Sequence, residues 1–352
     1  MHTTTGKGCH YQRPAGGQCE ATARSLIRIG GLVTLALGLL LTTVVAEAQP
    51  QGHIPRIGIL DPGSSPGRGC LAGLRQGLRD LGYVEGQTIT LVSRYADNQA
   101  DRLPTLAAEL VRLTPDVLWT HSTHAAQAAK QATTTLPIVV GVGSFDAAPG
   151  LVESLARPGG NLTGLDLLST EILGRRLALL KEAVPTISRV AVLVHPANPA
   201  HMVGLPNLGA EARRLGVQLQ HVELNAPEAL AWAFAAMLQG GVDALMLSEG
   251  SLFGGDTLQR ILAFASQHRL PTISGGRNYT AAGVLLGYGT YAYDMCQRSA
   301  VFVDKILKGA KPADLPVERA HKFELIVNLK TAKALGITIP PLVLFQADEV
   351  IR

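Results

Sequence analysis

Cysteine is scarce in this sequence. Four cysteines occur among 352 residues, and two of them, Cys9 and Cys19, precede the first long apolar run. The other two, Cys70 and Cys296, lie far apart, and two thiols make neither a disulfide framework nor a metal site. They could pair in an oxidising compartment, but we interpret them as two unpaired helix residues.

The chain also lacks an excess of charge of one sign. Lys and Arg number 31 against 27 Asp and Glu, which gives a formal net charge of +4. Residues 1–48 contain four basic and two acidic side chains, so their removal would lower the net charge by two, to +2. Because proteins bind nucleic acid by neutralising phosphates with Lys and Arg, we expect no nucleic-acid partner.

Motifs for catalysis, cofactors and metals are absent or incomplete. No G-x-x-x-x-G-K-[ST] sequence occurs. The G-x-S-x-G match at residues 63–67 has Pro66 after its serine, and proline has no N–H for an oxyanion hole. Residues 141–143 supply two glycines of a dinucleotide fingerprint without the third. His121 and His124 lack the further ligand that zinc needs. We therefore expect no enzyme, cofactor or bound metal.

The start of the chain has the pattern of an export signal. Arg28 precedes an apolar run from Ile29 to Val45, which ends in Ala46-Glu47-Ala48, the small-x-small pattern of signal-peptidase sites. This pattern predicts a signal peptide over residues 1–48 and a soluble periplasmic protein that begins near Gln49. A membrane anchor stays open as an alternative, because the run approaches the roughly 20 residues that a span needs.

From Arg56 onward, short apolar runs alternate with segments of helical period, a pattern typical of a parallel sheet. The first series has strands expected at 56–60, 89–95, 117–120 and 138–142, with helices ending at Leu81 and over 101–113 and 125–133. These strands are nearly continuous in apolar residues, which indicates that helices cover both faces of their sheet.

A second series follows the break at Asn161-Leu162-Thr163-Gly164. Its expected helices are 172–184, 205–215, 228–239 and 257–268, and its strands are 189–194, 218–223, 244–247 and 272–274. A segment at 284–287, a helix at 293–307, a strand at 323–328 and a short helix to Leu335 complete the pattern. The sequence thus predicts two doubly wound, Rossmann-like α/β lobes.

The chain should cross between these lobes three times, near residues 160–164, 287–290 and 311–317. We assign 54–162 plus 288–311 to the first lobe and 163–287 plus 312–352 to the second. Glycines at the first two crossings tolerate the dihedral changes of a hinge. The prediction is a three-stranded hinge, although the same segments also fit ordinary loops.

Several long segments resemble one known family. They are LRQGLRDLGYVEGQ at 74–87, DRLPTLAAELVR at 101–112, ATTTLPIV at 132–139, GLVESLARPGGNLTG at 150–164, and 319–341 with FELIVNLKTAKALGITIPP. These segments are similar to the tryptophan/tyrosine-type substrate-binding proteins of ABC transporters. The resemblance implies a type I periplasmic-binding fold, a ligand between the lobes, and a permease in the inner membrane as partner.

This sequence departs from the family pattern in two loops. Family members often have Gly-Asp-Pro where Ser144-Phe145-Asp146 stands here, and a His-Ser-Thr-His run occupies residues 121–124, in a loop that is commonly rich in Gly, Thr and Pro. The resemblance therefore carries over the scaffold, but not an aromatic amino acid as ligand.

Candidate ligand-binding residues follow the strands of both lobes, because open α/β sheets bind ligands at the carboxyl ends of their strands. They are Ser64, Ser65, Ser122, Thr123, His124, Ser144, Phe145 and Asp146 in the first lobe, Asn198, Glu249, Ser251, Arg277, Asn278 and Tyr279 in the second, and Tyr288 near the hinge.

Each type of side chain has a role. Ser122 and Thr123 begin a helix whose free N–H groups could hold a carboxylate. Asp146 or Glu249 could accept a hydrogen bond from an ammonium group. Phe145 and the tyrosines could pack on an apolar body. For every one of these residues, a role in loop structure or helix capping is the alternative.

The sequence as a whole predicts an exported, monomeric solute-binding protein. It would capture a small organic, amino-acid-like ligand and deliver it to an ABC transporter. A membrane sensor in place of the transporter stays open as the partner.

Overall fold

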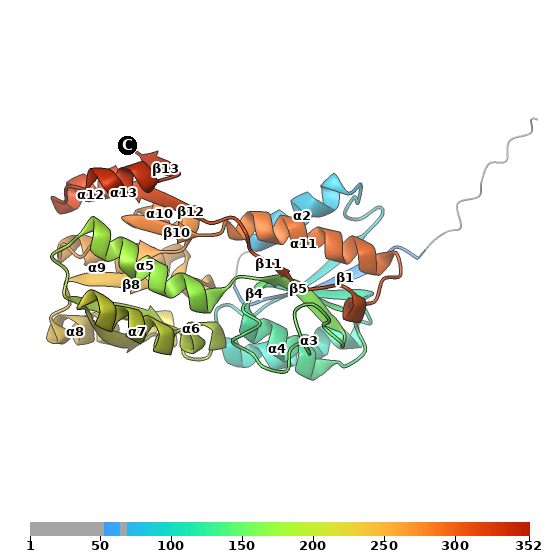
Figure 1. Cartoon of the computed structure of the whole chain (residues 1–352). Helices are drawn as coiled ribbons and strands as arrows, with labels where there is room; N and C mark the ends of the chain where they lie inside the picture. Colours follow the sequence, from blue (N-terminus) through green and yellow to red (C-terminus); the bar gives the residue numbers. More distant parts are fainter. Residues whose placement is uncertain (1–52, 64–68) are drawn as a thin grey trace, which may run out of the picture. The chain divides into compact units, whose positions relative to one another are not determined.

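The computed structural model describes residues 53–63 and 69–352, and Ile54–Arg352 form one compact unit with two sheets (Figure 1). The predicted signal peptide, Ser64 and Ser65 lie outside the described residues. Among the residues that are described, no helix has both the length and the apolar character needed to cross a membrane.

The first sheet has six strands, all parallel. They are β1 (Arg56–Asp61), β2 (Thr90–Tyr95), β3 (Val117–Thr120), β4 (Ile138–Gly143), β5 (Leu162–Asp166) and β11 (Glu318–Arg319), in the spatial order β11-β5-β4-β3-β1-β2. We call this sheet and its helices the first lobe. Its helices are α2 (Cys70–Asp80), α3 (Leu103–Arg112, after a short turn η1 at Ala100–Arg102), α4 (Thr123–Ala132) and α11 (Ala292–Leu307).

Both faces of this sheet are covered, as the apolar strands predicted. Trp119 and Val139 pack with α2 and α11 on one face. Their neighbours Leu118 and Val140 pack with α3 and α4 on the other face. Because successive side chains of a strand point to opposite faces, a strand buried on both faces needs apolar residues at every position.

The second sheet has seven strands. They are β6 (Arg189–Val194), β7 (Gln218–Glu223), β8 (Ala244–Leu247), β9 (Thr272–Ser274), β10 (Leu286–Gly289), β12 (Glu324–Asn328) and β13 (Glu349–Ile351), in the order β13-β12-β10-β9-β8-β6-β7. Strand β12 runs antiparallel to β10, and β13 pairs parallel to β12. We call this sheet and its helices the second lobe.

Helices cover both faces of the second sheet as well. On one face, α5 (Ser169–Ala183), α7 (Leu205–Leu215), α12 (Leu329–Leu335) and α13 (Pro341–Gln346) pack around Val190 and Val192. On the other, α8 (Leu230–Gly240, after η2 at Pro227–Ala229) and α9 (Gly255–Gln267) pack around Ala191 and Leu193. The lobe also contains α6 (Pro199–Val203), η3 (Ser251–Phe253) and α10 (Gly276–Ala282). The predicted fold class, two doubly wound α/β lobes, is confirmed.

Two of the three crossings between the sheets differ from the predicted ones by a few residues, whereas the second, after Gly289, lies within the predicted 287–290. The chain leaves the first sheet after β5, returns after β10, and leaves again between β11 and β12. Strands β5 and β11 pair with each other, Glu318 beside Leu165 and Arg319 beside Asp166, so both belong to the first sheet. The assignment of 163–166 and 318–319 to the second lobe was therefore wrong.

Strand β5 was missed because its sequence looks like a break. Gly164 has φ +150°, and a Cβ there would lie 2.2 Å from the carbonyl oxygen of Val140. Only glycine allows the two strands to approach so closely at this position. The glycine that suggested a loop is thus the residue that lets β5 pair with β4.

The two cysteines that remain after the predicted signal peptide form a disulfide, which corrects our interpretation of them as unpaired. Cys70 begins α2 and Cys296 lies in α11, with their Cα atoms 5.1 Å apart. The two helices are in close contact, since a Cβ on Gly77 would lie 2.2 Å from the carbonyl oxygen of Gln297. The cysteines are separated by 226 positions in the sequence, and no local pattern indicated this contact.

Candidate functional site

The loops that follow β3 in the first lobe and β6 in the second lobe meet. Helix α4 begins directly after the first loop and α6 directly after the second, and the two helices lie side by side (Figure 1). The ring centroids of His124 and His195 are 6.2 Å apart across this junction. Candidate residues from the two halves of the sequence are therefore brought together where the carboxyl ends of the two sheets face each other.

The hydroxyl groups of the first lobe position its loops. Ser122 has φ 108° and caps α4, with its Oγ accepting a hydrogen bond from the N–H of Ala125 at 3.4 Å. The buried Thr123 Oγ1 accepts from the N–H of Ser144 at 2.9 Å. The Ser122 bond caps the helix, and the Thr123–Ser144 bond fixes the loops after β3 and β4 relative to each other.

The Ser144-Phe145-Asp146 segment divides between core and surface. Ser144 is buried, and the Phe145 ring is 5% exposed and packs in the core beneath α4. Asp146 is exposed. The Phe145 N–H donates to Asp166 Oδ1 at 3.2 Å; burial raises the pKa of Asp166, although backbone N–H donors oppose this. Within this segment, Asp146 is the residue that reaches solvent.

Three histidines and an asparagine form the interlobe contact. His124 comes from α4, whereas His195, Asn198 and His201 come from the loop after β6 and from α6. Asn198 caps α6 and forms a side-chain hydrogen bond with His124. His201 accepts from the His195 N–H at 3.0 Å, and its Nε2 lies 2.7 Å from the carbonyl oxygen of Glu249.

Burial keeps these imidazoles neutral. It lowers the pKa of His124 to about 3, with a further contribution from the neighbouring histidines. It lowers the pKa of His201 to about 4 and also lowers that of His195. Nearby, His121 pairs with Asp61 at 3.2 Å; burial alone would raise the pKa of Asp61, but His121 holds it below its usual value.

A buried ion pair lies on the second-lobe side. Arg176 of α5 is 4% exposed and pairs with Glu249, and its Nε donates to the carbonyl oxygen of Tyr288 at 2.7 Å. The Tyr279 hydroxyl accepts from the Gly250 N–H at 3.0 Å. Burial raises the pKa of Tyr279, and Glu249 adds to this. Glu249 is thus held from several sides at the end of β8.

The remaining candidates of the second lobe lie elsewhere. Arg277 pairs with Glu324 at 3.2 Å and also with Glu349, so it ties α10 to β12 and β13. Asn278 is exposed on α10, and Ser251 begins η3. The Tyr288 ring stacks on Phe323, with centroids 6.1 Å apart.

Sequence reasoning missed Arg176, His195 and His201. His195 directly follows β6, so the rule that selected Asn198 would also have selected it. Arg176 lies beside Arg175 in a long helix, and nothing local distinguishes the buried arginine from the exposed one.

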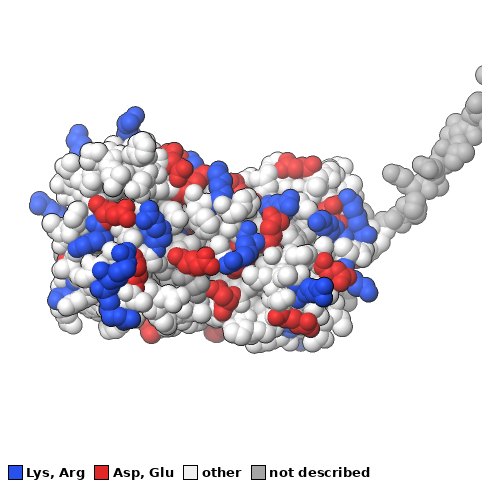
Figure 2. All heavy atoms as spheres, in the orientation of Figure 1, with Lys and Arg blue, Asp and Glu red and all other residues white. Residues whose placement is uncertain are grey.

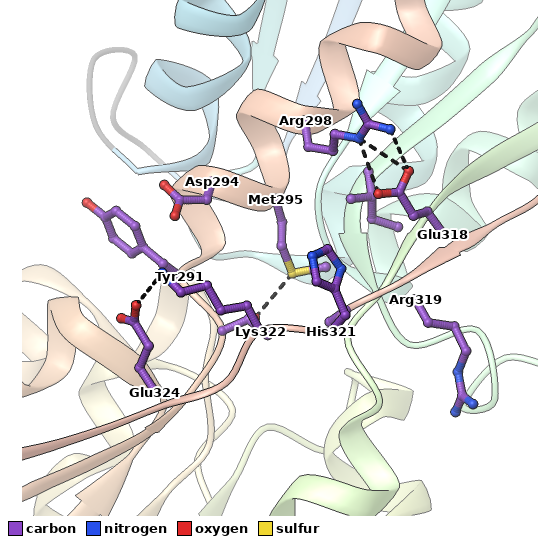
Figure 3. A pocket seen from close by; sticks show the side chains of 12 residues that line it. Tyr291, Asp294, Met295, Arg298, Glu318, Arg319, His321, Lys322 and Glu324 are labelled. Atoms are coloured by element: carbon purple, nitrogen blue, oxygen red, sulfur yellow. Dashed lines mark hydrogen bonds and ion pairs between the residues drawn. The ribbon is translucent and has the colours of Figure 1, made fainter. Parts of the chain in front are cut away.

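A small pocket lies at the hinge. It encloses about 150 Å³ beside the segments that follow β10 and β11. Figure 3 shows the ion pairs Arg298–Glu318 and Lys322–Glu324 at its wall, with Met295 and His321 between them. Candidate residues of both lobes meet instead at the His124–Asn198 junction, so we place the candidate site there and at the neighbouring Arg176–Glu249 pair.

The described residues differ in how well they match the ligand sets that metal ions and polar organic molecules need. Within residues 53–63 and 69–352, no group of three or more His, Cys, Asp or Glu is arranged to hold a metal ion. On the face drawn in Figure 2, acidic and basic side chains are interspersed. A buried arginine, a carboxylate and neutral imidazoles can together hold the polar groups of a small organic molecule.

Comparisons with known proteins agree with this fold. The family model described as ABC transporter substrate binding protein matches residues 56–351. A curated tyrosine-binding protein of Clostridioides difficile is 25% identical over 266 residues, which cover 75% of this chain and 76% of that protein.

Two solved structures are similar at a TM-score of 0.77, and each comparison covers 85% of this chain and 100% of the other. One is a conserved domain protein of Vibrio cholerae O1 biovar eltor, at 26% identity. The other is an ABC domain of Streptococcus pneumoniae in complex with L-Trp, at 23% identity.

Proposed function

This chain belongs to the family of ABC transporter substrate-binding proteins, and from that premise we propose that it captures an amino-acid-like molecule between its lobes and delivers it to a permease. The observation that carries the proposal is the junction at which polar groups of both lobes meet. His124 of the first lobe contacts Asn198 and His195 of the second, beside the Arg176–Glu249 pair. A ligand held there touches both lobes only when they are together.

The charges favour a zwitterion. Arg176 is a buried guanidinium with a planar fork of donors, and a carboxylate is its natural partner. Glu249 is 24% exposed, so its carboxylate can accept from an ammonium group while it pairs with Arg176. A relative is named for tyrosine and a similar structure holds L-Trp, which supports α-amino acids as the class to test first.

Ser122, Asp146, Tyr279 and Tyr288 remain proposed contacts at the rim of this junction. Export to the periplasm, a monomeric state and the absence of catalysis belong to the same proposal. They are supported by the apolar run before Gln49 and by membership of a solute-binding family.

Mass spectrometry of ligand retained by the protein purified under native conditions, followed by calorimetric titration with L-tyrosine and L-tryptophan, tests the function. We expect a retained small molecule and saturable binding with one site per chain. Glu249→Gln should weaken binding by more than about tenfold, because it removes the charge that faces the ammonium group. Glu182→Gln, on the surface of α5, is the control and should leave affinity unchanged.

Two results would count against the proposal. Absence of any retained molecule together with no heat from either amino acid would remove the proposed ligand class. Equal affinities of Glu249→Gln and the unchanged protein would remove Glu249 from the site.

A further inference from the structure

The contact between His124 and His195 joins the two lobes through two neutral rings. Each ring has an Nδ1 atom that is closed to solvent and has no hydrogen-bond partner among the described residues. Asn198 completes the contact through its hydrogen bond with His124. Because these residues come from different sheets, the contact exists only while the lobes lie together.

The surroundings do not compensate a positive charge on these rings. On the first-lobe side, Asp61 is already paired with His121. On the second-lobe side, the Glu249 carboxylate is paired with Arg176, and its carbonyl oxygen is bonded to His201. A protonated His124 would therefore meet the imidazoles of His121, His195 and His201 rather than an unpaired carboxylate.

Closure and protonation therefore oppose each other. Burial lowers the pKa of His124 to about 3 in the joined lobes, whereas a histidine in water has a pKa of roughly 6.5. As the pH falls below roughly 6.5, the separated form takes up a proton, but the joined form does not until the pH is near 3. Acid thus favours separation, and the effect is absent well above the pKa of a free histidine.

We propose that the contact of His124 with His195 and Asn198 is a proton-controlled latch, which holds the lobes together when the imidazoles are neutral and releases them, with any ligand, on mild acidification. The latch is separate from the identity of the ligand. Only a measurement of ligand affinity rests on the proposed function, because scattering of the ligand-free protein needs no ligand.

Small-angle X-ray scattering of the ligand-free protein tests the latch directly. Scattering is recorded at about pH 7.5 and about pH 5.5, one unit either side of the roughly 6.5 of a free histidine. The radius of gyration should be larger at the lower pH. In His124→Gln, where an uncharged amide replaces the imidazole, this increase should be smaller, because only His195 of the two rings can still take up a proton. His195→Gln serves as the second variant should His124→Gln fail to fold.

His221→Gln is the matched control, because His221 is exposed on β7. It should respond to pH as the unchanged protein does, and circular dichroism at both values verifies that the fold persists. If the radius of gyration of the protein without substitutions is the same at both pH values, the latch is overturned. An equal expansion of His124→Gln and His221→Gln would overturn it as well.

Calorimetry with L-tyrosine and L-tryptophan as probes gives the functional readout. One histidine that titrates near 6.5 only in the separated form weakens binding about tenfold between the two pH values. His124→Gln should lose the tenfold effect of His124 and keep only the part that His195 contributes. If neither probe binds at the higher pH, the proposed ligand class is wrong, while the scattering result still decides whether the latch exists.

Discussion

Reduction of the Cys70–Cys296 disulfide should destabilise the protein strongly. The bond joins α2 to α11 and closes a loop that spans 226 positions of the sequence and contains the second lobe as far as β10. The chain-entropy relation for a cross-link gives about 5 kcal/mol for a loop of this length, near the upper end of measured values. Because real disulfides often deliver less, we expect a loss of roughly 2–5 kcal/mol in the free energy of unfolding.

Urea denaturation, followed by circular dichroism with and without a thiol reductant, measures this loss. The double variant Cys70→Ala/Cys296→Ala is the control. It should have the lower stability from the outset and should not respond to the reductant. The variant also separates loss of the cross-link from any side effect of the reductant on other residues.

Thiol counting provides an independent check. The folded, unreduced protein without residues 1–48 should show no reactive thiol, and the denatured, reduced protein should show two. Two free thiols in the unreduced protein after denaturation would refute the pairing. Equal stabilities of the oxidised and reduced forms would refute the energetic argument.

Two further predictions concern the buried arginine and export. Arg176→Leu should lower the free energy of unfolding by roughly 2–3 kcal/mol, because Glu249 and the Tyr288 carbonyl oxygen lose a buried partner. The control Arg175→Leu, on the surface of the same helix, should change the free energy of unfolding by less than about 0.5 kcal/mol. Equal effects in thermal unfolding would contradict this reading. N-terminal sequencing of periplasmic extract should begin near Gln49, and material confined to the membrane fraction with residues 29–45 intact would contradict export.

The sequence by itself determined the alternation of strands and helices. Strands 117–120, 189–194 and 244–247 lie where the apolar runs predicted them, since a strand covered on both faces leaves a continuous apolar signal. The same pattern directed attention to the ends of the strands, where His124, Asn198 and Glu249 were selected. Such local signals report which side of an element is buried.

Only the tertiary structure decided which buried sides meet. The pairing of β5 with β11, the contact of α2 with α11 that joins Cys70 to Cys296, and the meeting of His124 with His195 all join residues far apart in the chain. Arg176 lies beside a surface arginine in the sequence, and its burial follows from the packing of α5 beside β9 and β10. Periodicity cannot encode these partners, because the interaction free energy depends on two surfaces, whereas a sequence pattern describes one of them at a time.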